Sequence, residues 1–162
     1  MITKERLLEL LEYKDGKLFW KVIPNRNGQI CVGSRAGTEH GNGYWTISID
    51  KKRYLEHRLV FLLFNGFMPV AIDHINGVKQ DNRIENLRKC SISENGYNAG
   101  LSKRNKSGIK GVGFHKKSNK WRARILRNYK EVYLGLYETM EEAEESVKKA
   151  REFICGEFSR HA

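Results

Sequence analysis

The chain has 162 residues and is strongly basic: 30 Lys and Arg oppose 19 Asp and Glu, which gives a net charge of +11. An excess of this size indicates a polyanionic partner, either nucleic acid or an anionic membrane surface. The hydrophobic share of 40% is enough for a core. The longest apolar run, residues 59–64, is far shorter than the roughly 20 residues of a membrane span. Membrane-spanning and collagen-like classes are therefore excluded.

The first residues and the cysteines indicate the compartment. Residues 1–6 lack the apolar segment of a secretory signal, which predicts a cytoplasmic rather than a secreted protein. Cys31, Cys90 and Cys155 are odd in number, far apart in the sequence and without a Cys-x-x-Cys spacing. This pattern argues against a disulfide framework and against a zinc knuckle, so we expect no structural zinc.

Short helices and strands joined by turns are predicted for the N-terminal part. Thr3 is the expected N-cap of the first helix, Asp15-Gly16 supplies a turn, and five glycines within residues 28–43 are typical of a loop. Gly66 is expected to end an apolar helix. The expected elements, in chain order, are a helix over 3–13, strands over 17–22, 44–49 and 54–55, and a helix over 57–64.

Two short strands and a helix are predicted for residues 71–100. A polar loop separates the strands, and Ser91 and Glu94 have the spacing of a capping box, which predicts the start of the helix. The expected segments are a strand over 71–75, a loop that begins with Asn76-Gly77 and passes through 81–83, a strand over 86–90, and a helix that carries Asn95 and Asn98.

A basic segment, residues 101–107, is expected to link this region to a second domain over residues 108–162. Thr139 and Glu142 again have capping-box spacing. The expected elements of this domain are strands over 111–116, 120–127 and 131–137, followed by a helix over 141–153. The sequence therefore predicts an α+β fold with two domains, residues 1–100 and 108–162.

Four polar side chains have the chemistry that phosphodiester hydrolysis needs. Mg²⁺ prefers hard oxygen ligands and takes few of them from protein, so the carboxylate of Asp73 and the amide of Asn95 suit an incomplete ligand shell. The imidazole of His74, with an ordinary pKa of about 6.5, suits proton removal from water, and an amide such as Asn86 suits the orientation of its ring. The same residue types also suit a simple hairpin turn, and their spacing alone leaves both interpretations open.

A longer pattern around these residues resembles the HNH endonucleases of phages and mobile introns. The likeness is dense between residues 57 and 98 and weaker over most of residues 15–100. It is carried by the run 57–63, Gly66, Pro69, Asp73-His74-Ile75-Asn76-Gly77, Asp81-Asn82-Arg83-Ile84-Glu85-Asn86-Leu87-Arg88, and Ser93-Glu94-Asn95 with Asn98.

The resemblance implies a ββα-metal finger over about residues 71–100, preceded by a small β-rich region. It implies His74 as general base, Asp73 and Asn95 as ligands of one divalent cation (Mg²⁺, with Mn²⁺ as the alternative), and Asn86 as the residue that braces the finger and orients the histidine. Asparagine as the third residue of the motif is found in the subgroup that includes intron-encoded nicking enzymes.

The paired Cys-x-x-Cys motifs of many HNH relatives are missing from this chain. Arg83 and Arg88 are candidates for contacts with the phosphates that flank the cut, or else are solvated arginines. His57 opens an apolar helix and is either a second site histidine or a structural one. In place of zinc, apolar packing of four residues is expected to hold the finger: Ile72, Ile75, Ile84 and Leu87.

Positive charge is concentrated between residues 105 and 138, which contain nine Lys and Arg and two acidic residues. In a strand, Lys120, Arg122 and Arg124 fall on one face and the apolar residues between them on the other. The cationic face is expected to have no acidic partner of its own and to contact DNA, although a merely solvated face is the alternative. The apolar face is expected to pack on the final helix through Met140, Ala143, Val147, Ala150 and Phe153 or Ile154.

Three motifs lie in this basic unit: Ser107-Gly108-x-Lys110-Gly111-Val112, Lys120-Trp121-x-Ala123-x-Ile125, and Tyr133-Leu134-Gly135-x-Tyr137-x-Thr139-x-Glu141-Glu142-Ala143. With them, residues 107–157 resemble the apetala-type, or ethylene-response-factor, DNA-binding domain, which phage HNH enzymes often carry at the C-terminus. The resemblance implies DNA contacts from the exposed face of the sheet. The positions concerned are His115, Lys117, Arg122, Arg124 and Tyr133.

Together these observations predict a metal-dependent, site-directed DNA endonuclease of the homing type. It is expected to nick double-stranded DNA as a monomer, without an organic cofactor or a membrane partner, in a bacterial host or phage-infected cell. The alternative is a non-catalytic, sequence-specific DNA-binding protein derived from an HNH nuclease. An RNA-binding module is a third interpretation, disfavoured because no aromatic stacking platform of the RNA-recognition type is evident.

Overall fold

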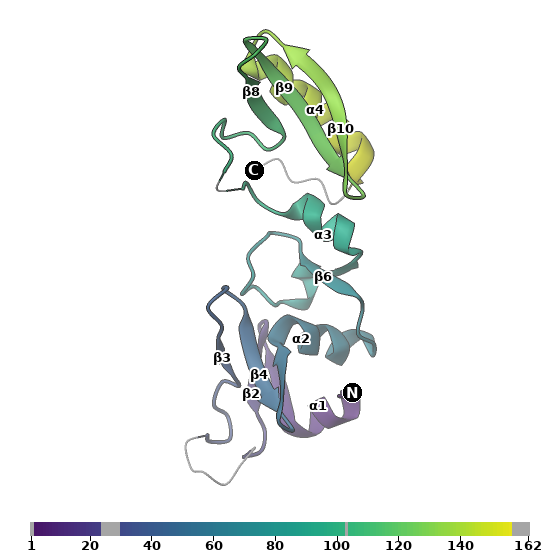
Figure 1. Ribbon diagram of the computed structural model, residues 1–162. Helices are drawn as coiled ribbons and strands as arrows, with labels where there is room; N and C mark the ends of the chain where they lie inside the picture. Colours follow the sequence, from purple (N-terminus) through teal and green to yellow (C-terminus); the bar gives the residue numbers. More distant parts are fainter. Residues whose placement is uncertain (1, 24–29, 103, 157–162) are drawn as a thin grey trace. The chain divides into compact units, whose positions relative to one another are not determined.

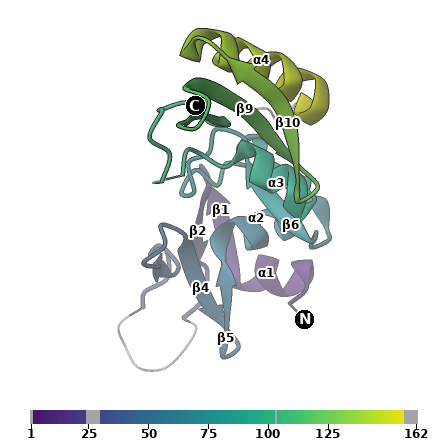
Figure 2. The same cartoon turned by 45° about the horizontal axis from the view of Figure 1, so that its top comes forward.

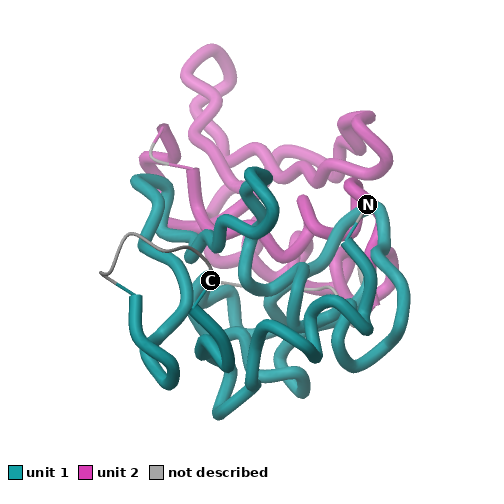
Figure 3. Tube along the Cα trace, turned by 90° about the horizontal axis from the view of Figure 1, so that it is seen from below, with its two compact units in different colours: residues 1–89 teal, residues 90–162 magenta. Residues whose placement is uncertain are grey.

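The computed structural model describes residues 2–23, 30–102 and 104–156. The chain divides into two compact units, residues 1–89 and 90–162 (Figure 3). Each unit has its own hydrophobic core, and each combines helices with small β-sheets. The mixed α and β composition agrees with the expected fold class. Within the described ranges, no helix is both long enough and apolar enough to cross a bilayer.

Three small sheets and two helices make up the first unit. Strands β1 and β2 form an antiparallel hairpin, β3, β4 and β5 form an antiparallel sheet in that order, and β6 pairs with β7 (Figures 1 and 2). The elements are α1 (Lys4–Leu10), β1 (Leu11–Lys14), β2 (Lys17–Trp20), β3 (Thr38–Glu39), β4 (Trp45–Ile49), β5 (Lys52–Leu55), α2 (Glu56–Asn65), β6 (Ala71–His74), a 3₁₀ turn (Ile84–Asn86) and β7 (Leu87–Cys90).

The first helix is shorter than predicted. It begins after the N-cap Thr3, as expected, but ends at Leu10, and the following residues pair with β2 instead of continuing the helix. Asp15 and Gly16 both have positive φ, at 45° and 78°, which is the geometry of a tight hairpin turn. Cross-strand pairing at this turn therefore overrides the helical pattern of residues 11–13. Residues 24–29 of the predicted glycine-rich loop lie outside the described residues.

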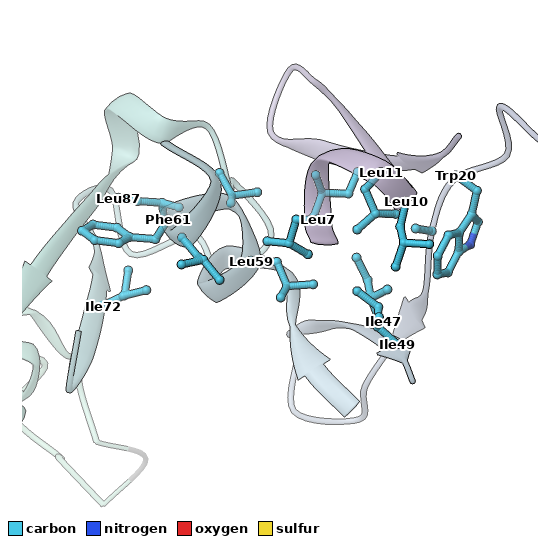
Figure 4. Packing of buried hydrophobic residues seen from close by; sticks show 14 residues of the cluster. Leu7, Leu10, Leu11, Trp20, Ile47, Ile49, Leu59, Phe61, Ile72 and Leu87 are labelled. Carbon is cyan, nitrogen blue, oxygen red and sulfur yellow. The ribbon is translucent and has the colours of Figure 1, made fainter. Parts of the chain in front are cut away.

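The core of the first unit joins the two helices to the sheets. Leu7 of α1 and Leu59 of α2 are almost fully buried, and Figure 4 shows them between two groups of apolar side chains. Of the residues expected to hold the finger, Ile72 and Leu87 are buried in this core and Ile84 packs against it. The expectation was wrong for Ile75, which is 46% exposed because it follows the end of β6 and begins a turn.

The turn at Gly16 packs against the loop that leads to the 3₁₀ turn. A Cβ at this position would lie 2.7 Å from the backbone nitrogen of Arg83 and 3.0 Å from the carbonyl carbon of Asn82. We expect Gly16→Ala to lower the free energy of unfolding in urea by about 1–3 kcal/mol, from the strained φ and the contact together. Gly33 is the matched control, since its φ is +81° and its Cβ would meet nothing within 4 Å. Equal losses in the two variants would contradict a contribution from the contact.

The second unit is a three-stranded antiparallel sheet covered by one helix, preceded by a short helix. The capping boxes predicted at Ser91 with Glu94 and at Thr139 with Glu142 are both confirmed. The strands lie in the order β10-β9-β8, and α4 runs along one face of the sheet (Figures 1 and 2). The elements are α3 (Ile92–Asn98), β8 (Val112–His115), β9 (Lys120–Arg127), β10 (Lys130–Tyr137) and α4 (Met140–Cys155).

Small and branched residues join α4 to the sheet. Ala143 and Val147 of α4 are buried, with Ala123 and Ile125 of β9 in the same cluster. At the end of the helix, Ile154 packs against this core, whereas Phe153 is 91% exposed. The predicted pairing of this helix with the apolar face of β9 is confirmed, with Ile154 as its last contact.

Candidate active site

Strand β6 holds two polar side chains in the interior of the first unit. Asp73 is 3% exposed and His74 is 5% exposed, so both faces of this short strand are covered. Burial lowers the pKa of His74 below its ordinary value, and the hydrogen bond to Asn82 acts in the opposite direction. The imidazole is therefore neutral at pH 7, which is the protonation state that a general base requires.

A chain of hydrogen bonds connects His74 to α2 and β2. His74 Nε2 lies 2.9 Å from Asn82 Oδ1, and Asn82 Nδ2 donates to Glu56 Oε2 at 2.8 Å. Glu56 Oε1 accepts from the backbone N–H of Leu18 at 2.9 Å, and Arg35 Nη2 lies 3.4 Å from Oε2. Burial raises the pKa of Glu56, while the Leu18 N–H, Arg35 and Asn82 lower it.

Asn86 braces the loop between the strands. Its Oδ1 accepts from the backbone N–H of Asn76 at 3.0 Å, and its Nδ2 donates to Asn76 Oδ1 at 3.0 Å and to the carbonyl of Asp81 at 2.7 Å. Because both ends of the amide are engaged in the loop, the partner found at His74 Nε2 is Asn82, not the predicted Asn86. A catalytic contribution of Asn86 stays a prediction.

The two arginines next to the motif are engaged in ion pairs. Arg88 places Nε and Nη2 at 2.8 and 2.7 Å from Asp73 Oδ2. Arg83 donates to both oxygens of Asp81 at 2.8 Å, and this hydrogen bonding is the main reason why the pKa of Asp81 is lowered to about 2. The Arg83 side chain is exposed, whereas that of Arg88 is mostly buried beside the Asp73 carboxylate.

The predicted metal ligands fall in different units. Asp73 belongs to the first unit, and Asn95 lies on α3 in the second, so their joint binding of an ion stays a prediction. Among the described residues, no three His, Cys, Asp or Glu side chains gather into a group that could hold a metal. The donor types nevertheless fit Mg²⁺, which needs only one or two hard oxygens from the protein.

His57 and Tyr44 pack around the His74 ring. The ring centroids of His57 and His74 are 5.0 Å apart in an edge-to-face arrangement, and Tyr44 lies 5.3 and 6.1 Å from them. Burial, followed by the charges of His74 and Arg58, lowers the pKa of His57 to about 3. His57 therefore reaches the site, as a neutral packing partner.

This arrangement predicts an acid-sensitive fold. Between pH 6.5 and about 3 the unfolded chain protonates His57 while the folded chain does not, so stability is complete above pH 6.5 and falls as the pH is lowered. One such group contributes about 1.4 kcal/mol per pH unit. We expect His57→Phe to remove this contribution, measured as a shallower loss of unfolding free energy between pH 6.5 and 4. An unchanged slope would contradict the neutral state of His57.

The basic residues predicted to contact DNA share one face of the second sheet. Arg122 pairs with Gly113, Arg124 with Tyr133 and Lys120 with His115, and these positions face away from α4. Lys117 lies in the turn between β8 and β9. The expectation that this face has no acidic partner was wrong. Lys120 lies 2.6 Å from Glu138, and Arg124 forms an ion pair with Glu131, because the segment's two acids lie on or directly after the adjacent β10.

The comparison with known families concerns the segment that contains the predicted site residues. The HNH endonuclease family matches residues 54–97, which include Asp73, His74, Asn86 and Asn95. The chain therefore contains a segment that is similar to the HNH endonuclease family.

Two viral proteins are similar to longer stretches of the chain. Protein 3.8 of Escherichia phage T7 is 30% identical over 106 residues, which cover 64% of this chain and 87% of that protein. A protein of Acanthamoeba polyphaga mimivirus described as an uncharacterized HNH endonuclease is 26% identical over 122 residues, 74% of this chain and 63% of that protein. No solved structure matches the chain significantly.

Sequence reasoning missed the polar residues that support His74. Asn82 stood inside the HNH-like motif, but nothing in its spacing marked it as the partner of the histidine. Glu56 directly precedes His57 and is 0% exposed, although an acid at the start of a helix is usually solvated. The only feature of the sequence that could have identified Glu56 is its position as a single carboxylate next to an apolar helical run. No feature of the sequence identifies Arg35.

Proposed function

We propose that the chain is a metal-dependent, site-directed DNA endonuclease of the homing type that nicks double-stranded DNA. The observation that carries this proposal is the buried, neutral His74 next to Asp73 in strand β6, within the segment that matches the HNH family. The match to that family supports nucleic acid as the substrate.

In this proposal, His74 accepts a proton from the attacking water and Asp73 and Asn95 hold one divalent ion, Mg²⁺ or Mn²⁺. The ion would neutralise charge on the scissile phosphate and on the departing oxygen. Asn86 keeps the loop between β6 and β7 in place through Asn76 and Asp81. Arg83, on the exposed surface, would contact a flanking phosphate. Arg88 would contact a phosphate only after its ion pair with Asp73 is broken.

The second unit is proposed to hold the DNA in the manner of an apetala-type domain. The basic face of its sheet supports this role, with Arg122 and Arg124 near the middle of the central strand. Since the chain carries one matched HNH segment, we propose that a monomer makes a single nick.

Supercoiled plasmid tests the proposal. With Mg²⁺ the protein should convert it to open circles before any linear product, and EDTA should stop the conversion without eliminating DNA binding. Linear product from the first turnover would contradict nicking. Binding without cleavage in either Mg²⁺ or Mn²⁺ would contradict the enzyme and support the alternative, a non-catalytic DNA-binding protein.

Removal of Arg122 should weaken DNA binding in a salt-dependent way. No ion pair is found for this side chain in the part of the chain that the structure describes, so its charge is available to a phosphate. We expect Arg122→Ala to reduce the slope of log K against log salt by about one. Lys149→Ala, on the exposed surface of α4, is the charge-matched control and should leave the slope unchanged. The same slope in both variants would remove Arg122 from the phosphate contacts.

A further inference from the structure

The hydrogen bonds behind His74 have a fixed polarity. Glu56 is 0% exposed and receives three donors: the Leu18 N–H on Oε1, and Asn82 Nδ2 and Arg35 Nη2 on Oε2. The Leu18 N–H and Arg35 can only donate, and they make both Glu56 oxygens acceptors, so the amide of Asn82 turns its NH₂ group toward Glu56. Its carbonyl oxygen then faces His74 Nε2 at 2.9 Å.

A carbonyl oxygen can only accept, so the neutral His74 must carry its hydrogen on Nε2. The lone pair is then on Nδ1. From this geometry we propose that Glu56 and Asn82, anchored by Arg35 and the Leu18 backbone, are positioning residues that set the tautomer of His74 and make Nδ1 its basic atom. This inference rests on the proposed function for its consequence in catalysis, whereas the tautomer itself can be measured without any cleavage.

Arg35 contacts Glu56 at the end of this series of hydrogen bonds that is farthest from His74. Its guanidinium carbon lies 3.5 Å from the centre of the Trp45 ring, and Trp45 Nε1 in turn donates to the carbonyl of Ala36 at 2.7 Å. The backbone N–H of Leu18 belongs to strand β2, which is paired with β1. Glu56 is therefore oriented by one backbone donor within a sheet and by one cation packed on an indole ring, and it transmits this orientation to Asn82.

The variant Glu56→Gln reverses the donor and acceptor roles in the hydrogen bonds from residue 56 through Asn82 to His74. The side chain of residue 56 keeps almost the same shape. Its amide oxygen must stay at the Leu18 N–H, because that donor is fixed in a strand, and its NH₂ group then faces Asn82. Asn82 must turn over to accept from it, which presents NH₂ to His74 Nε2 and forces the hydrogen onto Nδ1. The double variant Glu56→Gln with Asn82→Asp restores an acceptor at both contacts of residue 82, and with it the Nε2–H tautomer.

Two-bond ¹H–¹⁵N correlation spectra of ¹⁵N-histidine-labelled, full-length protein at pH 7 measure the tautomer. The expected results are Nε2–H in the wild type, Nδ1–H in Glu56→Gln and Nε2–H again in the double variant. Cleavage should fall at least about 100-fold in the single variant and recover in the double variant, because a base in the wrong tautomer loses its function. Glu39→Gln, which removes a charge from the exposed strand β3, is the control and should change neither result.

An Nδ1–H tautomer in the wild type, or an unchanged tautomer in folded Glu56→Gln, would overturn the inference. If the single variant does not fold, the double variant still decides, since an Nδ1–H tautomer there would contradict the proposed polarity. The expected tautomers in a protein that cleaves no DNA would instead overturn the proposed function and leave the positioning role intact.

Discussion

Replacement of His74 by alanine is expected to lower the rate of DNA cleavage by about 10²–10⁴-fold, the usual contribution of a general base. The imidazole is buried and neutral, and His74 directly follows Asp73 in strand β6. DNA affinity should change by no more than a few-fold, because a side chain 5% exposed offers little surface to the nucleic acid. Single-turnover cleavage and equilibrium binding, measured on the same DNA, separate the two effects.

His40 supplies the matched control for this experiment. It is an exposed histidine of the same unit, and its ring contacts Asn42. His40→Ala should cleave at the wild-type rate. If His74→Ala also keeps the wild-type rate, His74 is not the base.

The second large effect is expected on stability, from Glu56→Ala. This change removes the carboxylate that accepts from the Leu18 N–H, Asn82 Nδ2 and Arg35. These donors then lose their acceptor in the interior of the unit. Breaking a buried charged pair in this way costs about 3–5 kcal/mol. Urea denaturation of the wild type and the variant should show this difference in the free energy of unfolding.

The variant Glu39→Ala is the control that separates the effect of burial from the loss of a carboxylate as such. Glu39 is exposed on β3 and accepts a single hydrogen bond from Gln80. Its loss should cost no more than about 0.5 kcal/mol. Similar losses at Glu56 and Glu39 would mean that the buried hydrogen bonds of Glu56 contribute nothing beyond an ordinary surface charge.

Local sequence signals predicted much of the fold because the responsible interactions are local. The N-cap Thr3, the two capping boxes and the turn at Gly16 each join residues at most a few positions apart, and all are present. The alternation of basic and apolar residues in β9 also fixed which side faces α4. Where a distant strand competed with a local pattern, as at residues 11–13, the sequence prediction was wrong.

The site was only partly predictable for the same reason. Asp73 and His74 were identified by their neighbours in the motif, but the support of His74 comes from residues 18, 35, 56 and 82. Such contacts over long sequence separations leave no periodicity to detect. On the second sheet, Glu131 and Glu138 are distant from Arg124 and Lys120 in sequence and become partners only through the β9–β10 hairpin.

Paramagnetic Mn²⁺ gives the most direct measurement of the proposed metal site. In a titration of ¹⁵N-labelled protein followed by NMR, the first signals to broaden should be the His74 ring and the Asn95 side-chain amide, and excess Mg²⁺ should restore them. Asp73→Asn should abolish this broadening at low Mn²⁺. Broadening that begins at other carboxylates while His74 and Asn95 stay sharp would contradict a shared ion beside the histidine.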